Sequence, residues 1–231
     1  MNFVLRGAIF DFDGVIVDSH PVHKRAWRRF LESVGRTTSE EDLQFVLDGR
    51  KREDILRHFL GDLDSDLMIE YGHRKEQFFR NEATDVQTIE GLQSFLQDLA
   101  DSHVLLGVAS SGSGSRVNFL LDRLDLKKHF RLVVTGDQVE LGKPDPAIYL
   151  RAAQDLQLDP LELIAFEDAH SGVRAAKSAG MMCVGIAQPD RASSLLDSGA
   201  DHVVPDFCSL SYLKLQELLN GRRPGPRPSI P

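Results

Sequence analysis

The feature that most constrains the fold is an alternation, from about residue 89 onward, of short apolar runs with segments of helical periodicity. Apolar residues at positions 92, 95, 96 and 99, and again at 117, 120, 121 and 124, have the spacing of one helix face. The apolar runs are short and bounded by Gly, Asp, Ser or Pro, which is typical of buried strands. Alternating strands and helices predict an α/β fold with a parallel sheet and helices on both faces. The runs expected to be strands are Val4–Phe10, Val104–Ala109, Leu132–Thr135, Leu163–Phe166, Cys183–Ala187 and His202–Val204.

The stretch from about Pro21 to Asn81 interrupts the alternation. It has helical spacing throughout, a helix start at Ser39, and no strand-like run. This pattern predicts an all-helical domain inserted directly after the first strand. We therefore expect a core of residues 1–17 and 85–220, a helical domain of residues 18–84 with hinges near 17–19 and 83–85, and a disordered Pro-rich tail of residues 221–231.

Charge and cysteine content limit the classes of partner. The chain has 231 residues, with 27 Lys and Arg against 35 Asp and Glu, so its formal net charge is -8. This balance disfavours nucleic acid or an anionic membrane as the main partner. Two cysteines exclude a disulfide scaffold and a cysteine-based zinc cluster. With no signal-peptide pattern and no apolar run near ~18 residues, we expect a cytoplasmic protein without a membrane span, and nothing requires more than a monomer.

Two carboxylates follow the first predicted strand. Asp11 and Asp13 are separated by one residue and followed by Gly14, which permits a tight turn. Ligands of open α/β sheets bind at the carboxyl ends of the strands, where these side chains would lie. On their own, the two acids are equally well interpreted as solvated loop residues that cap the next helix.

Later strand ends carry three further polar features. Ser110 and Ser111 open a Ser/Gly loop before a helix, Lys143 lies in a loop stiffened by two prolines, and an acidic pair follows the fourth strand. Each feature also has an interpretation without function: the first as a flexible linker, the second as one surface lysine among many, and the third as an ordinary helix N-cap. Together the features are more specific, because clustered carboxylates repel unless a cation intervenes. Oxygen ligands suit Mg²⁺, and the lysine and hydroxyl loop suit a phosphoryl group beside it. The acidic pair is Glu167 and Asp168.

This combination resembles the phosphatases of the haloacid dehalogenase (HAD) superfamily, with all four family motifs spread over residues 9–172. The resemblance implies a Rossmann-like sheet and a helical cap of the C1 type at the position of the inserted domain. It also implies that Asp11 attacks phosphorus to form an aspartyl-phosphate and that Asp13 serves as general acid and then general base. Asp13 favours phosphate ester chemistry over the dehalogenase branch, which lacks this second acid. The resemblance further assigns phosphate binding to Ser110, Ser111 and Lys143, and Mg²⁺ binding to Asp11, Glu167, Asp168 and the backbone carbonyl of Asp13.

The cap segment resembles that of β-phosphoglucomutases. The resemblance implies that His23 lies near the hinge, that Arg52 grips the distal phosphate of the substrate, and that Lys75 lies near the active site. The alternatives are a partly buried helix histidine and a solvated arginine at a helix start. The chain also departs from the mutase pattern, with Ser113 and Gly114 in place of Lys and Asn, and with Asp48 in place of a usual Lys. The cations that could compensate are Arg50, Lys51 and Arg116.

Three functions remain open. The favoured hypothesis is an Mg²⁺-dependent hydrolase of a small phosphorylated metabolite, such as a sugar or polyol phosphate. The main alternative is β-phosphoglucomutase-type transfer between sugar 1- and 6-phosphates, weakened by the lost distal-phosphate groups. The third is a non-catalytic binding protein on the same fold, against which the complete set of reactive residues argues.

Overall fold

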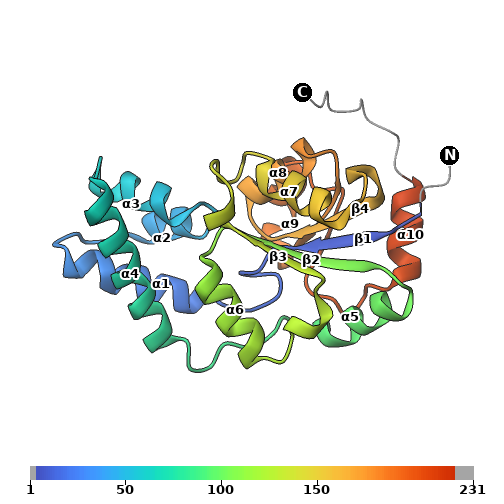
Figure 1. Cartoon of the computed structure of the whole chain (residues 1–231), viewed down its shortest axis with the longest axis horizontal. Helices are drawn as coiled ribbons and strands as arrows, with labels where there is room; N and C mark the ends of the chain where they lie inside the picture. The colour runs from blue at the N-terminus through green and yellow to red at the C-terminus, as the bar shows by residue number, and fades with distance from the viewer. Residues whose placement is uncertain (1–3, 222–231) are drawn as a thin grey trace.

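The computed structural model describes residues 4–221 and is built on a single six-stranded parallel sheet (Figure 1). The strand order is β3-β2-β1-β4-β5-β6, so β1 lies in the middle with β2 and β4 on its two sides. Each predicted strand is present, which confirms the expected fold class. The strands are β1 (Gly7–Phe10), β2 (Leu105–Ser110), β3 (Leu132–Thr135), β4 (Leu163–Glu167), β5 (Met182–Ile186) and β6 (His202–Val204).

Helices cover both faces of the sheet because successive strand residues point to opposite faces. In β1, Ala8 and Phe10 face a core shared with α5 (Leu92–Asp101), α6 (Gly114–Arg123) and α10 (Tyr212–Gly221). Ile9 faces a second core shared with α7 (Ala147–Leu156), α8 (His170–Ser178) and α9 (Pro189–Asp197). Burial on both faces explains why the strands read as short continuous apolar runs.

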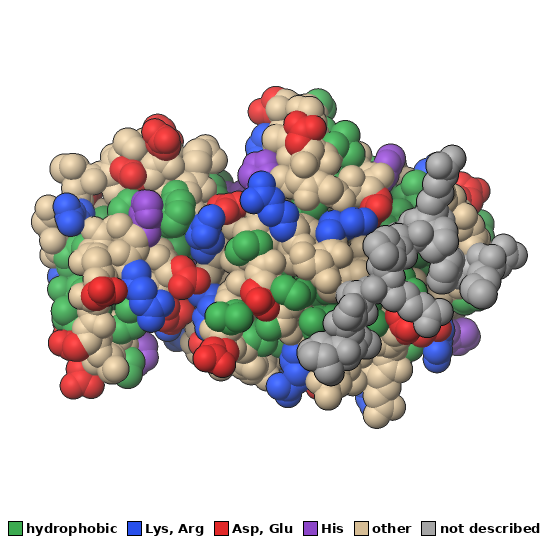
Figure 2. Space-filling model, turned by 90° about the horizontal axis from the view of Figure 1, so that it is seen from above, with side chains coloured by type: hydrophobic (Ala, Val, Ile, Leu, Met, Phe, Trp, Pro, Cys, Tyr) green, Lys and Arg blue, Asp and Glu red, His purple; other side chains and the backbone are tan. Residues whose placement is uncertain are grey.

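Four of the five helices between β1 and β2 form a separate lobe beside the sheet (Figures 1 and 2). They are α1 (His20–Ser33), α2 (Glu40–Val46), α3 (Arg52–Leu60) and α4 (Ser65–Glu82). Ser39 caps α2 with its side chain, as its place before an acidic turn predicts. The lobe has its own apolar cluster, so we refer to it as the cap. Its buried members are Trp27, Phe30, Leu31, Leu43, Val46, Ile55 and Leu56.

Two linkers join the cap to the core, and they lie side by side. Val17 pairs with Thr88 in an antiparallel bridge, and the amide of Asp18 donates to the carbonyl of Gln87 at 2.9 Å. The guanidinium of Arg123, on α6 of the core, donates to the carbonyls of Ala83 and Thr84 in the second linker. The chain therefore leaves and re-enters the core at one place, near the predicted hinges.

Two further predictions concern the Pro-rich tail and membrane-spanning helices. Gly221 is the last residue of α10, and the rest of the predicted Pro-rich tail, residues 222–231, lies outside the described residues. Within residues 4–221, each helix is too short or too polar to cross a bilayer.

Candidate active site

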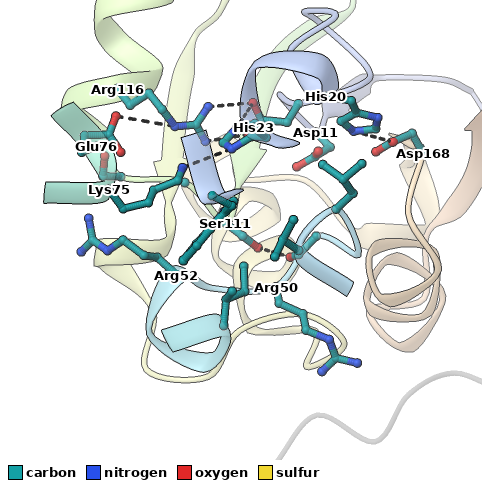
Figure 3. A pocket seen from close by; sticks show the side chains of 18 residues that line it. Asp11, His20, His23, Arg50, Arg52, Lys75, Glu76, Ser111, Arg116 and Asp168 are labelled. Carbon is teal, nitrogen blue, oxygen red and sulfur yellow. Dashed lines mark hydrogen bonds and ion pairs between the residues drawn. The ribbon is translucent and has the colours of Figure 1, made fainter. Parts of the chain in front are cut away.

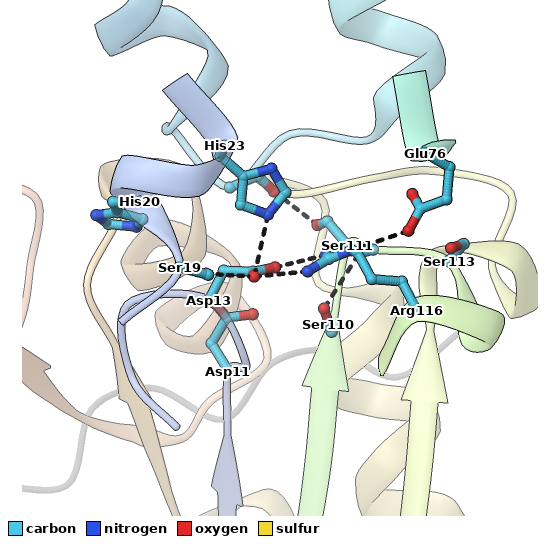
Figure 4. Close-up of polar contacts among 12 residues, drawn as sticks. Asp11, Asp13, Ser19, His20, His23, Glu76, Ser110, Ser111, Ser113 and Arg116 are labelled. Atoms are coloured by element: carbon cyan, nitrogen blue, oxygen red, sulfur yellow. Dashed lines mark hydrogen bonds and ion pairs between the residues drawn. The ribbon is translucent and has the colours of Figure 1, made fainter. Parts of the chain in front are cut away.

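The candidate site lies at the carboxyl ends of the central strands, where the cap faces the sheet (Figure 4). Asp11 directly follows β1, Ser110 ends β2, and Glu167 ends β4. From β1 the chain continues to β2 on one side, whereas β4 occupies the other side, so the strand order reverses at this point. Reversal points of this kind form the ligand crevice of open α/β sheets.

Lys143 lies fully buried among the carboxylates. Its Nζ is 2.6 Å from Asp11 Oδ1 and 2.5 Å from Glu167 Oε1, and it also donates to the carbonyl of Ala109 at 3.1 Å. The hydroxyl of Tyr149 donates to the same Glu167 oxygen at 2.5 Å. Burial raises the pKa of Asp11 well above its usual value, Lys143 opposes that rise, and the neighbouring carboxylates add to it. One lysine therefore compensates only part of the negative charge.

The charge that remains suits a divalent cation. The side chains of Asp11, Glu167 and Asp168 each offer an oxygen, and these oxygens lie within 4.8 Å of one another. Asp168 Oδ2 is buried and receives no well-aligned hydrogen bond, although His20 Nε2 lies 3.1 Å from it. Ala169 precedes α8 as its N-cap residue, so the alternative role of Asp168 as N-cap is wrong. Three buried carboxylates with one unsatisfied oxygen fit the hard oxygen ligands that Mg²⁺ takes.

Asp13 is held by several donors rather than lying free in solvent. Its Oδ1 accepts from Ser19 Oγ at 2.6 Å and lies 3.1 Å from His23 Nε2. Arg116 donates from both terminal nitrogens, at 2.7 Å to Oδ1 and 2.6 Å to Oδ2. Burial alone would raise the pKa of Asp13, but Arg116 and then His23 bring it well below its usual value.

His23 links Asp13 to a buried lysine of the cap. Its other ring nitrogen, Nδ1, is 3.2 Å from Lys75 Nζ, which lies over the rings of Trp27 and Phe79. Burial, with Lys75 next in importance, lowers the pKa of His23 to about 3. Burial also lowers the pKa of Lys75 to about 7. Near neutral pH, His23 is therefore uncharged and Lys75 is close to its titration midpoint.

The predicted phosphate-binding loop, which begins at Ser110, belongs to the core and contacts the cap. Ser110 Oγ accepts from the amide of Gly112 at 3.1 Å, and Ser111 Oγ donates to the carbonyl of Gly49 in the cap at 2.6 Å. Ser171 donates to the carbonyl of Asp48, and Lys51 Nζ donates to the carbonyl of Val139 at 2.9 Å. These three hydrogen bonds hold the cap loop against the core beside the pocket.

The cap supplies arginines to the pocket wall (Figure 3). Arg52 Nη2 pairs with Glu53 at 2.8 Å, and its buried Nε has no hydrogen-bond partner. A Cβ at Gly72 of α4 would lie 2.8 Å from Arg52 Cζ, so glycine makes room for this guanidinium. Arg50 pairs with Asp48 at 3.2 Å, and Lys51 points to the core loop rather than into the pocket.

Most of the predicted site residues come together. Asp11, Asp13, Ser111, His23, Arg52, Lys75 and Asp168 line one pocket, while Ser110, Lys143 and Glu167 are buried just behind it. Sequence reasoning missed Ser19, His20 and Glu76, and it named Arg116 only as a substitute cation for a distal phosphate. The structure instead pairs Arg116 with Asp13. Its position on the first turn of the helix after the Ser/Gly loop is the signal that could have indicated this location.

Comparison with known proteins settles the family. The model of the haloacid dehalogenase-like hydrolase family matches residues 8–186. The chain belongs to this family. It is 33% identical over 221 residues to the "Phosphorylated carbohydrates phosphatase" of Thermotoga maritima, covering 94% of this chain and 97% of that protein. It is 31% identical to the "Beta-phosphoglucomutase" of Bacillus subtilis, covering 92% and 95% of the two chains.

A solved HAD structure has the same arrangement of core and cap. The crystal structure of β-phosphoglucomutase from Clostridium difficile superposes with a TM-score of 0.82 at 25% identity, covering 94% of this chain and 98% of that one. The similarity therefore extends over nearly the whole chain and includes both the sheet and the cap. Relatives of similar identity include both phosphatases and mutases, so overall similarity does not separate these two activities.

Proposed function

We propose that this protein is an Mg²⁺-dependent phosphatase that hydrolyses a small phosphorylated sugar or polyol through an aspartyl-phosphate. The observation that carries the proposal is the pair of aspartates after β1, one beside buried Lys143 and the other held by Ser19, His23 and Arg116. The similarity to the phosphorylated carbohydrates phosphatase of Thermotoga maritima supports the substrate class.

The first step forms the phosphoenzyme. A carboxylate oxygen of Asp11 attacks phosphorus, and the bond from phosphorus to the ester oxygen breaks. Asp13 gives a proton to that oxygen, so the sugar leaves as a neutral alcohol. This role requires the bound phosphate to raise the pKa of Asp13 from the low value that Arg116 and His23 set in the free protein. Lys143 and the loop that begins at Ser110 compensate charge on the phosphoryl oxygens.

The second step returns the enzyme to its starting state. Asp13, now ionised, takes a proton from water as the water oxygen bonds to phosphorus. The bond from phosphorus to Asp11 breaks, and inorganic phosphate leaves with the carboxylate restored. Mg²⁺ held by Asp11, Glu167, Asp168 and the carbonyl of Asp13 would supply positive charge to the phosphoryl group. Positioning and charge compensation are the main sources of rate in such transfers.

β-Phosphoglucomutase activity is the second candidate. Arg52 favours it, because a half-buried guanidinium with an unused, buried Nε donor can take a second phosphate at the far end of a bisphosphate. Against it stand Ser113 and Gly114, which offer no positive charge on the core side. The further core cation, Arg116, is engaged with Asp13.

Phosphorus NMR distinguishes the two activities. The protein is incubated with Mg²⁺, β-glucose 1-phosphate and a trace of the 1,6-bisphosphate. Inorganic phosphate as the product supports the phosphatase, whereas glucose 6-phosphate supports the mutase. If the substrate is unchanged, a panel of hexose and hexitol phosphates follows.

Two further results bear on the proposal as a whole. The variant Asp11→Asn should lose turnover while keeping its thermal melting temperature, because the substitution removes the nucleophile and preserves its shape. Failure of the wild-type protein to release phosphate from any ester in the presence of Mg²⁺ would overturn the proposed function and revive a binding role.

A further inference from the structure

Asp13 is held by groups that belong to different parts of the molecule (Figure 4). Ser19 lies in the linker to the cap, and His23 lies on α1 of the cap itself. Arg116 lies on α6, which packs on the sheet. Two of the three partners therefore belong to the cap or its linker, and the third is fixed to the core.

The contact from Arg116 is the strongest of the three. Both of its terminal nitrogens reach the carboxylate, at 2.7 and 2.6 Å, and its side chain is only 4% exposed. A planar guanidinium that meets both oxygens of a carboxylate fixes its rotation as well as its position. Ser19 and His23, by contrast, both contact only Oδ1.

The local sequence is arranged to admit this guanidinium. A Cβ at Gly112 would overlap Nη2 of Arg116, so the arginine needs glycine at this position of the phosphate-binding loop. Its Cζ lies 5.9 Å from the ring centre of Phe12, the residue between the two aspartates. On the cap side Arg116 has two neighbours that make no hydrogen bond to it: the ring of Phe79, 5.0 Å from Cζ, and Glu76, whose Oε1 is 3.9 Å from Nε.

Three hydrogen bonds hold the cap loop against the core beside the pocket, and we expect them to break when the cap opens. When it does, His23 moves with α1, whereas Arg116 and Asp13 both remain with the core. We propose that Arg116 is a positioning residue that keeps Asp13 in its reactive place with the cap open, and thereby directs the phosphoryl group to water. This inference rests on the proposed phosphatase function and gives a reason why water accepts the phosphoryl group.

Asp13 acts as general base in the second step of the reaction, in which the phosphoenzyme is hydrolysed. Water bonds to phosphorus, Asp13 accepts the water proton, and the bond from phosphorus to Asp11 breaks to give inorganic phosphate. A mutase must protect its phosphoenzyme from this reaction until a sugar has bound, so its acid–base group should be placed only by cap closure. A carboxylate fixed from the core has no such dependence, and water can react as soon as the first product leaves.

Pre-steady-state kinetics with p-nitrophenyl phosphate and Mg²⁺ tests the role of Arg116. p-Nitrophenolate needs no proton to leave, so formation of the phosphoenzyme should depend little on Asp13. In Arg116→Ala, hydrolysis of the phosphoenzyme should slow on the order of 100-fold, since general base catalysis typically contributes that much or more. The variant should then release a burst of about one p-nitrophenolate per active site, with accumulation of phosphoenzyme in acid-quenched samples, and the wild-type protein should show no burst.

Two variants complete the experiment. Arg116→Lys keeps the charge and loses the two-pronged contact, so it should give a smaller burst, and it carries the test if Arg116→Ala does not fold. Arg80→Ala is the matched control, because Arg80 is exposed and packs on α6 through Phe119 at 5.7 Å without contacting Asp13. It should behave as the wild type does.

The results separate this inference from the proposed function. A burst in Arg116→Ala together with none in the control supports the positioning role. Equal loss in both steps without a burst would show that Arg116 is merely structural, and a full burst in the wild type would contradict the rapid reaction of the phosphoenzyme with water. Absence of any wild-type turnover would instead remove the proposed function and this inference together.

Discussion

At the scale of single residues, the most unusual feature is the buried chain from Asp13 through His23 to Lys75. His23 Nε2 is 3.1 Å from Asp13, and its Nδ1 is 3.2 Å from the lysine. Since a neutral imidazole donates from only one nitrogen, the charge states of its two neighbours decide its tautomer. Burial, with nearby Arg116 and Arg52, lowers the pKa of Lys75, although Glu76 and Asp13 act in the opposite direction.

Lys75 should make stability depend on pH above neutrality. Its pKa falls from 10.5 to about 7 on folding, so between these values the unfolded chain binds the proton more strongly. The free energy of unfolding should therefore rise between pH 7 and 10, by on the order of 4 kcal/mol at most. Urea denaturation at several pH values should show this rise in the wild type and in Lys24→Met, and a clearly smaller one in Lys75→Met. Equal slopes in all three proteins would contradict the shifted pKa.

The loss of activity on substitution of Asp13 should increase with the basicity of the leaving group. Asp13→Asn keeps the shape of the side chain and removes the proton that it would donate. The loss in kcat/KM should be on the order of 10³-fold for a sugar phosphate and much smaller for formation of the phosphoenzyme from p-nitrophenyl phosphate. A burst assay measures that step. The same loss for both leaving groups would exclude Asp13 as the general acid.

At the scale of elements, Gly72 shows how a helix gives up stability for a site. It lies inside α4, where glycine costs about 1 kcal/mol relative to alanine. The space that it leaves is taken by the guanidinium of Arg52, whose Cζ would lie 2.8 Å from a Cβ at this position. The helix thereby lets an arginine of α3 reach the pocket wall.

Gly72→Ala should therefore separate stability from substrate binding. The free energy of unfolding should rise by up to about 1 kcal/mol, because alanine favours the helix and the far end of Arg52 can shift. The KM for the best sugar phosphate should increase several-fold as this guanidinium is displaced, with little change for p-nitrophenyl phosphate. Chemical denaturation and steady-state kinetics measure the two effects. An unchanged KM would mean that Arg52 does not contact the substrate.

Sequence periodicity was sufficient for the elements but not for every contact between them. Each predicted strand is present and the inserted segment is helical, with strand ends that differ by up to three residues, as at β1, which begins at Gly7 rather than Val4. Residues after strand ends were predictable because parallel strands bring their carboxyl ends to one edge. Arg116 and Glu76 were not, since each occupies an ordinary polar position on a helix. Arg116 meets Asp13 only once the core has folded, and Glu76 approaches Arg116 only when cap and core meet.

At the scale of the whole molecule, charge within the core links folding to metal binding. Three carboxylates converge where one buried lysine is present, and β1 and β4 bring them there. A divalent cation that binds this folded cluster and not the unfolded chain must stabilise the fold.

Mg²⁺ should raise the thermal melting temperature. At a Mg²⁺ concentration one hundred times its Kd, the added stability should be about 2.7 kcal/mol. Differential scanning fluorimetry with a Mg²⁺ titration measures the shift, and NaCl at matched ionic strength serves as the control. In Asp168→Asn the titration should move to much higher Mg²⁺. An identical response of the variant, or of NaCl, would argue against a metal at these three carboxylates.

The adjacent linkers have a consequence for how such proteins diversify. The chain departs from the core at Val17 and returns beside it at Thr88, so the gap that the insertion bridges is no wider than one strand pair. The sheet therefore places almost no demand on the length, order or internal packing of what lies between those residues. A different helical module spliced at this junction would keep the nucleophile, the buried lysine and the acidic cluster of the core, so new substrate preferences can evolve by exchange of the cap if the new module again supplies contacts to Asp13.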